Sequence, residues 1–213
     1  MDTVTDYIKL TNTKFIISSH VSTYEKCALR LIESYKLNNI PIENIIVVIG
    51  GCDQKLQKGN IIHTDHNSYD HSAIIEIVEK NLKSKYWFIS HDTCEAGPNF
   101  FNLIKNFKIS SPYISITEMG WLNMGLFSQK FIENNCDYIK SLKNCSKRRA
   151  ILSERVFTKL DKYDHFGKQS EVQIIEDCKI YNDGKKRNTL YFPFIDFYKF
   201  QSFDAAKEME LLK

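Results

Sequence analysis

The sequence predicts an α/β protein in which a mixed, mostly parallel central sheet is flanked by helices on both faces. Three observations lead to this prediction. Short apolar runs that suit fully buried strands alternate with segments whose apolar residues recur at helical spacing. Several of these runs end in polar residues, as parallel strands do where they reach a ligand-binding edge. The chain has 213 residues, 43% of them apolar, which is enough to bury one core.

The first half of the chain reads as strands separated by helices. Strands are expected at residues 14–20 (KFIISSH), 45–49 (IIVVI), 61–63 (IIH), 86–90 (YWFIS) and 113–117 (YISIT). A helix capped by Ser22 or Thr23 follows the first strand, a second spans the apolar stripe from Ala73 to Leu82, and Pro98 opens a third. This alternation predicts parallel strands joined by helical crossovers.

The second half is expected to be more helical and more basic. Helices are expected from Gln129 to Asn134, up to Leu160 and over residues 204–212, with a turn at Asp183-Gly184 and a late strand broken by Pro193. No internal repeat or low-complexity linker divides the chain. We therefore expect one domain over residues 1–213, with a strand-rich half at about 12–117 and a more helical half at about 118–213.

Composition narrows the class of protein. Lys and Arg number 29 and Asp and Glu 26, so the net charge of +3 disfavours a nucleic-acid binder. Mean hydropathy is −0.35, and no run of about 18 apolar residues predicts a transmembrane segment. The six cysteines never stand at CxxC spacing, which indicates free thiols in a reducing, cytoplasmic compartment. No signal peptide is expected at the N-terminus.

Several common site motifs are missing, which directs attention to the strand ends. The sequence has no GxGxxG after its first strand, no GxxxxGK[ST] and no GxSxG. Ligands bind beyond the carboxyl ends of the strands in open α/β sheets. The polar residues at 18–20, 50–53, 63–70 and 90–93 are therefore expected to meet at one edge of the sheet.

The fourth strand and its polar end, residues 86–93 (YWFISHDT), resemble the DxD region of GT-A-fold glycosyltransferases. The resemblance implies that Asp92 binds a divalent cation, Mn²⁺ or Mg²⁺, which neutralises the diphosphate of a nucleotide sugar. His91 and Ser90 stand where further acids are common in that family, so His91 either binds the metal or only forms hydrogen bonds. A plain strand-end aspartate is the alternative for Asp92.

A second segment, residues 121–128 (WLNMGLFS), is similar to the acceptor-side segment of the same family. It implies that Trp121 and Asn123 contact the acceptor, a glycan or glycoprotein hydroxyl; a core tryptophan and a satisfied loop amide are the alternatives. The resemblance covers roughly residues 12–160. It implies that the half at about 12–117 binds the nucleotide and that the half at about 118–213 is the acceptor side. The layout is also similar to the glycosyltransferase module of viral capsid-glycosylation proteins, which implies a UDP-sugar donor and further domains in a longer chain.

The resemblance assigns further residues to the nucleotide sugar. The nucleotide-sugar set is Ser18, Ser19, His20, Asp53, Asp70, His71, His91, Asp92 and Arg187. Their alternatives are structural: a helix N-cap region at 18–20, a tight turn beside Asp53, a favourable helix-dipole contact for Asp70 and an exposed basic turn around Arg187. Glu154 is the expected general base if the reaction inverts the anomeric carbon, and otherwise a solvated helix residue.

The sequence thus predicts a metal-dependent glycosyltransferase and leaves two alternatives. A sugar-phosphate nucleotidyltransferase would use a similar sheet, but it usually carries a glycine-rich basic loop after the first strand, where this chain has Ser18-Ser19-His20-Val21. A non-catalytic glycosyltransferase-like binding module would keep the fold without binding metal. Replacing Asp92 separates the catalytic and non-catalytic alternatives.

Overall fold

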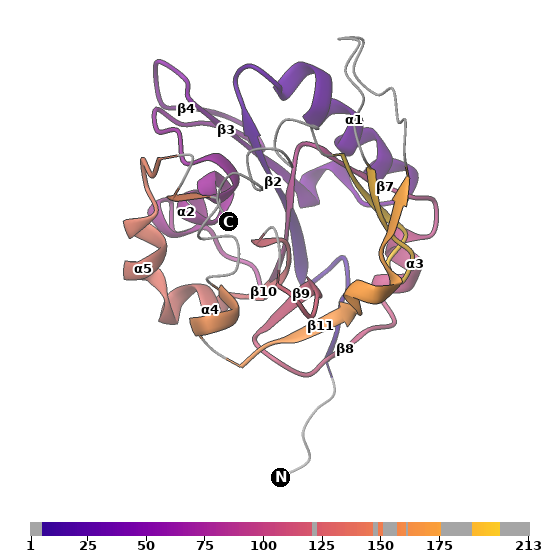
Figure 1. The fold of residues 1–213 in the computed structure, drawn as a ribbon. Coiled ribbons are helices and arrows are strands. Elements are labelled where there is room, and N and C mark those ends of the chain that lie inside the picture. Colours follow the sequence, from indigo (N-terminus) through magenta and orange to yellow (C-terminus); the bar gives the residue numbers. More distant parts are fainter. Residues whose placement is uncertain are drawn as a thin grey trace.

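The computed structural model describes residues 6–120, 123–146, 149–150, 157–160, 162–175 and 189–200 (Figure 1). Its centre is an eight-stranded sheet. In spatial order the strands are β11 (Asp164–Gly167), β9 (Tyr113–Thr117), β10 (Gly125–Ser128), β6 (Tyr86–His91), β2 (Thr13–His20), β3 (Ile45–Gly50), β5 (Ile61–His63) and β4 (Leu56–Lys58). All five strands expected from the first half of the sequence belong to this sheet.

The large sheet is mixed, and the expectation of a mostly parallel sheet is corrected. Four of its pairings are parallel: β11–β9, β6–β2, β2–β3 and β3–β5. Three are antiparallel, because β10 lies between β9 and β6 and runs against both, and β4 folds back on β5 through a two-residue loop. The parallel part is therefore confined mainly to the β5-β3-β2-β6 half.

Two smaller antiparallel sheets complete the described strands. One has the order β12 (Gln173–Ile175), β13 (Thr189–Phe192), β14 (Phe197–Phe200) and β7 (Cys94–Ala96), and the other pairs β1 (Asp6–Tyr7) with β8 (Lys108–Ile109). The first part of the late strand expected around Pro193 is β13, but Phe194 and Ile195 lie in the turn that leads to β14, so the expected continuation past Pro193 is corrected. Because β14 pairs with β7, the β13–β14 hairpin is joined to the segment that directly follows the end of β6.

Helices cover both faces of the large sheet, as predicted. The α-helices are α1 (Tyr24–Leu37), α2 (Ser72–Glu79), α3 (Phe100–Ile104), α4 (Gln129–Asn134), α5 (Cys136–Ser141) and α7 (Phe157–Leu160). Short 3-10 turns occur at η1 (Ile42–Asn44), η2 (Tyr69–His71) and η4 (Gln169–Glu171). In Figure 1, α2, α4 and α5 lie on one side of the sheet, and α1, α3 and β7 lie on the other. The turn expected at Asp183-Gly184 and the helix expected at 204–212 lie outside the described residues.

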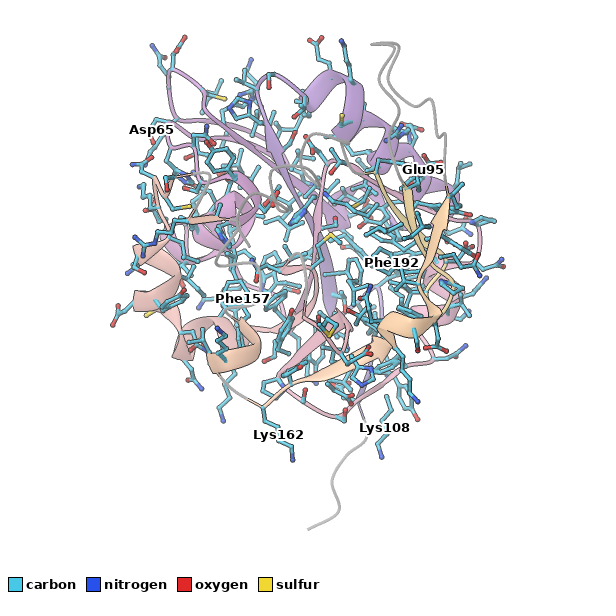
Figure 2. All side chains as sticks on the ribbon, viewed as in Figure 1. Asp65, Glu95, Lys108, Phe157, Lys162 and Phe192 are labelled. Carbon is cyan, nitrogen blue, oxygen red and sulfur yellow. The ribbon has the colours of Figure 1, made fainter. Side chains whose placement is uncertain are left out.

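Alternation along the central strands divides the interior into two cores. Phe15 and Ile17 of β2 belong to the core beneath α1, α3 and the four-stranded sheet. Ile16 belongs to the core beneath α2, α4 and α5. Successive strand side chains point to opposite faces, so a continuous apolar run fills both cores. Figure 2 labels one residue of each: Phe157 of the helical core and Phe192 of the other.

Two further features of the described residues bear on the sequence expectations. The longest helix, α1, has 14 residues, and no described helix has the length and apolar character needed to cross a membrane. The five described cysteines are free thiols, as expected; they are Cys27, Cys52, Cys94, Cys136 and Cys145.

Candidate functional site

A pocket of about 330 Å³ opens where β2 and β6 end. It is lined by Ser18, Ser19, His20, Ser22, Thr23, Asn67, Tyr69, Asp70 and Asp92. The chain first adds β3 and β5 on one side of β2 and then adds β6 on the other side. The order in which strands are added therefore reverses between β2 and β6. Such a reversal opens a crevice at the carboxyl ends of the strands and is where open α/β sheets bind ligands.

Asp92 is fixed at the floor of this pocket. Its backbone N–H continues the β2–β6 pairing by donating to the Ser18 carbonyl at 2.9 Å. One carboxylate oxygen, Oδ2, accepts hydrogen bonds from Ser19 Oγ at 2.8 Å and from Thr23 Oγ1 at 2.6 Å. No described residue donates to the other oxygen, Oδ1. Two hydroxyls therefore hold the carboxylate in one orientation while Oδ1 stays available to a ligand.

Asp70 supplies a second carboxylate to the same pocket. It lies in η2, and its carbonyl accepts a hydrogen bond from Ser18 Oγ at 3.0 Å, which ties this turn to the end of β2. Burial alone would raise the pKa of Asp70, but the nearby charges of His91, Lys199 and His71 outweigh it and lower the pKa. Asp70 is therefore a carboxylate at neutral pH, and its side chain is 40% exposed.

A buried lysine that the sequence analysis does not identify contacts the two residues that flank Asp92. Lys199 of β14 is 8% exposed; its Nζ lies 3.2 Å from His91 Nδ1 and donates to Thr93 Oγ1. His91 Nδ1 in turn lies 3.5 Å from Asp70 Oδ1. Lys199 Nζ and Asp70 Oδ1 both lie against His91 Nδ1, so protein groups already surround this nitrogen and it is not free to bind a metal. The structure thus favours the hydrogen-bonding alternative for His91.

His20 lies at the pocket's edge in a geometry that a glycine permits. Its Nδ1 accepts from the Ser22 backbone at 3.2 Å and contacts Ser22 Oγ at 2.8 Å. The ring packs over Gly51, whose φ is +73°; a Cβ there would come within 2.5 Å of His20 Nε2. The glycine after β3 therefore does more than make a tight turn, since any side chain would push the imidazole away.

The structure does not bring every expected residue to the pocket. Asp53 is exposed on the loop after β3 and is not among the lining residues. His71 is fully buried and packs edge-on against Phe157 at 6.2 Å, and burial lowers its pKa. The ring of His71 thus belongs to the core and does not line the pocket, and its expected contact with a donor stays a prediction. Asn123 is buried just before β10, with a left-handed φ of +48°.

Three expected site residues lie outside the described part of the chain. These are Trp121, Glu154 and Arg187. The positions expected for acceptor contact, for the general base and for the basic contact to the diphosphate therefore remain predictions from the sequence.

A second group of potential metal ligands does not line this pocket. His66, Glu76 and Glu79 form the one group of three His, Cys, Asp or Glu ligand atoms lying within 4.8 Å of one another among the described residues. His66 Nε2 contacts Glu76 Oε1 at 3.1 Å, and Glu79 accepts from Lys143 Nζ at 2.6 Å. Because Glu76 is paired with His66 and Glu79 with Lys143, this group is accounted for as a polar network linking the 64–71 loop to α2.

The pocket itself suits a hard divalent cation shared with a phosphate ligand. Mg²⁺ is usually held by one or two carboxylates, with water and substrate phosphates completing its coordination. Asp92 Oδ1 and the Asp70 carboxylate are oxygen donors of this kind in one pocket. The residues present therefore fit a Mn²⁺ or Mg²⁺ ion that arrives with a diphosphate.

No protein-family model matches the chain, and no curated protein matches it. The function of this pocket is therefore inferred from its residues and their place in the fold.

Proposed function

We propose that this chain is a metal-dependent glycosyltransferase of the GT-A type, which moves a sugar from a UDP-sugar to a hydroxyl of a glycan or glycoprotein. The observation that carries the proposal is the pocket at the β2–β6 reversal with the oriented Asp92 carboxylate at its floor. The sequence resemblance places a diphosphate-binding aspartate at this same strand end. The strand order β5-β3-β2-β6 supports a nucleotide-binding half of the Rossmann kind.

Each part of the pocket has a task in this proposal. Asp92, together with Asp70 of the same pocket, would hold Mn²⁺ or Mg²⁺, which would supply positive charge for the departing diphosphate. Ser19 and Thr23 keep the Asp92 carboxylate oriented, so that little reorganisation is needed when the ligand arrives. The hydroxyls of the pocket are suited to hydrogen bonds with ribose and phosphate oxygens.

The transfer step joins the acceptor oxygen to the anomeric carbon while the bond from that carbon to the diphosphate breaks. In an inverting reaction, Glu154 would take the proton of the acceptor hydroxyl, and the nucleoside diphosphate would leave with the bonding electron pair. In a retaining reaction, the departing diphosphate can take that proton, and Glu154 has no catalytic task. Trp121 and Asn123 are proposed on the acceptor side in both cases.

A thermal-shift panel tests the proposal most directly. UDP, GDP, CMP and ADP are each added with and without Mn²⁺, and the unfolding midpoint is measured. A ligand at 100 times its dissociation constant stabilises by about 2.7 kcal/mol. We expect UDP to raise the midpoint, and Mn²⁺ to be required for this effect. No response to any nucleotide with metal would overturn the proposal.

Variants of Asp92 and Asp65 separate site binding from general charge effects. Asp92→Asn retains the shape and an acceptor oxygen but removes the charge, and it should abolish the Mn²⁺-dependent response and sugar transfer. Asp65 is an exposed acid that pairs with Lys55 at 3.5 Å, outside the pocket lining. Asp65→Asn changes the charge equally and should respond to UDP like the wild type. An active Asp92→Asn enzyme would contradict the assignment.

A further inference from the structure

One aromatic side chain faces a pocket that is otherwise built from polar groups. Tyr69 is 37% exposed and lines the pocket; the other lining side chains carry hydroxyl, carboxylate, amide and imidazole groups. A large apolar ring exposed at a polar pocket makes no contribution to the core that would explain its presence. An aromatic face can instead bury a flat ligand group against it.

The backbone holds Tyr69 in an unfavourable conformation. Its φ is +50°, in the left-handed region that non-glycine residues rarely adopt. The residues around it are fixed: Ser68 Oγ accepts from the Asn144 backbone at 3.0 Å, and the Asp70 carbonyl accepts from Ser18 Oγ at 3.0 Å. A strained conformation that is held by its surroundings is characteristic of ligand sites.

The course of the chain places Tyr69 on the nucleoside side of the pocket. The segment from β5 to η2 passes over the end of β3, where the Gly51 and Cys52 backbone N–H groups donate to the carbonyls of His66 and Thr64. It then reaches the end of β2 at Asp70. Tyr69 therefore approaches from the β3–β5 side of β2, while Asp92 enters from β6 on the other side.

We propose that Tyr69 is the residue on which the nucleobase of the donor stacks, an inference that rests on the proposed function. The metal and diphosphate occupy the acidic end of the pocket, and the neutral base covers the exposed ring. Stacking depends on the π-face that every base has, so Tyr69 sets affinity for the nucleoside rather than the choice of base.

Binding of UDP and of inorganic pyrophosphate, each with Mn²⁺, separates this role from diphosphate binding. Calorimetry is done on the wild type, Tyr69→Phe and Tyr69→Asn. Asn tolerates the left-handed backbone better than Tyr, so Tyr69→Asn removes the ring without new strain and should not lower the unfolding midpoint. We expect Tyr69→Asn to weaken UDP binding about 5- to 150-fold, the effect of losing one base–aromatic stack.

The two ligands give each outcome a distinct meaning. Unchanged pyrophosphate binding in Tyr69→Asn, with normal UDP binding in Tyr69→Phe, would support stacking. Equal weakening of UDP and pyrophosphate would overturn it, because Tyr69 would then shape the diphosphate site. Unchanged UDP binding in Tyr69→Asn would also overturn it while leaving the proposed function intact. If the wild type binds neither ligand, the proposed function itself fails.

Discussion

The Thr23 side chain forms a hydrogen bond with the candidate site and not with its own helix. It occupies the N-cap position of α1, where threonine usually accepts a hydrogen bond from the first helical turn. No such bond forms, and the Thr23 hydroxyl donates to Asp92 Oδ2 at 2.6 Å. The sequence expectation of a cap at this residue therefore locates the helix start correctly but misses the use of the hydroxyl. Local preferences are often overridden at functional sites.

Replacing Thr23 tests this division of roles. Thr23→Val removes the hydroxyl without removing a helix cap, and it leaves Asp92 Oδ2 with one donor, Ser19. We expect the free energy of unfolding to fall by about 1.5 kcal/mol, the usual loss for a hydrogen bond to a charged group. Mn²⁺-dependent UDP binding should weaken as well. Thr23→Ser restores the hydroxyl, and a defect as large as that of Thr23→Val would contradict the role given to it.

The residues of the pocket were predictable from the sequence where they end strands and not where they arrive by tertiary contact. Ser18, Ser19 and Asp92 follow apolar runs, so the rule for parallel strands brings them to one edge. Lys199 carries no such signal, because it reaches His91 through strand pairing 108 residues away in the chain. The strand expected around Pro193 ends before Lys199, and the apolar neighbours of Lys199 do not indicate that they pair with β7.

At the scale of elements, the loop between β5 and η2 is held to α2 by a buried pair. His66 Nε2 contacts Glu76 Oε1 at 3.1 Å, and both side chains are almost fully buried. His66 Nδ1 also contacts Ser68 Oγ at 2.8 Å. Since Asp70 and Tyr69 follow directly in the chain, this anchor contributes to their placement at the pocket.

The Glu76 pair predicts a specific dependence of stability on pH. Burial raises the pKa of Glu76, but hydrogen bonds from His66 and Thr64, with the charges of His66 and Lys80, outweigh it and bring the pKa below the ordinary 4.5. A carboxyl group whose pKa is lower in the folded than in the unfolded state stabilises the fold at pH values above its unfolded-state pKa. This contribution is lost as the pH falls through the folded-state pKa. In urea titrations from about pH 5 to 3, the wild type should therefore lose more stability than Glu76→Gln.

An exposed glutamate provides the matched control for that measurement. Glu33 pairs with Lys36 on the surface of α1 at 2.8 Å, and such pairs contribute little to stability. Glu33→Gln should follow the wild-type pH profile. Parallel profiles for the wild type and Glu76→Gln would show that the buried pair has no linkage to acid unfolding.

The antiparallel strand β10 marks the limit of what the sequence predicts about the sheet. Residues 125–128 (GLFS) form too short an apolar run to be distinguished from a loop, and the family resemblance places them in an acceptor-side segment. In the structure they pair on both sides, with β9 and β6. Gly125 makes this possible, because its φ is +137° and a Cβ there would come within 2.1 Å of the Ile114 carbonyl. Hydrophobic periodicity identifies strands, but pairing partners are set by such tertiary contacts.

At the scale of the whole molecule, an aromatic cluster joins the eight-stranded sheet to the four-stranded one. Phe88 of β6, Phe100 of α3 and Phe197 of β14 have ring centroids 5.1 to 6.0 Å apart. All three rings are fully buried in one core. The β13–β14 hairpin, which carries Lys199, is therefore packed against the same core as the strands that form the pocket.

This shared core predicts that the described elements unfold together. Phe197→Ala removes a buried ring, and we expect the free energy of unfolding to fall by about 3–5 kcal/mol. Because the cavity opens in a common core, near-UV and far-UV signals should shift to the same lower midpoint and remain a single transition. Ile174→Ala in β12 alters a side chain that is 64% exposed and should change stability by under about 0.5 kcal/mol.

If the hairpin were a separate unit, Phe197→Ala would instead produce an early partial transition and leave the main midpoint unchanged. UDP binding in the presence of Mn²⁺ would then persist through that early transition, whereas a single cooperative unit should lose it together with the fold.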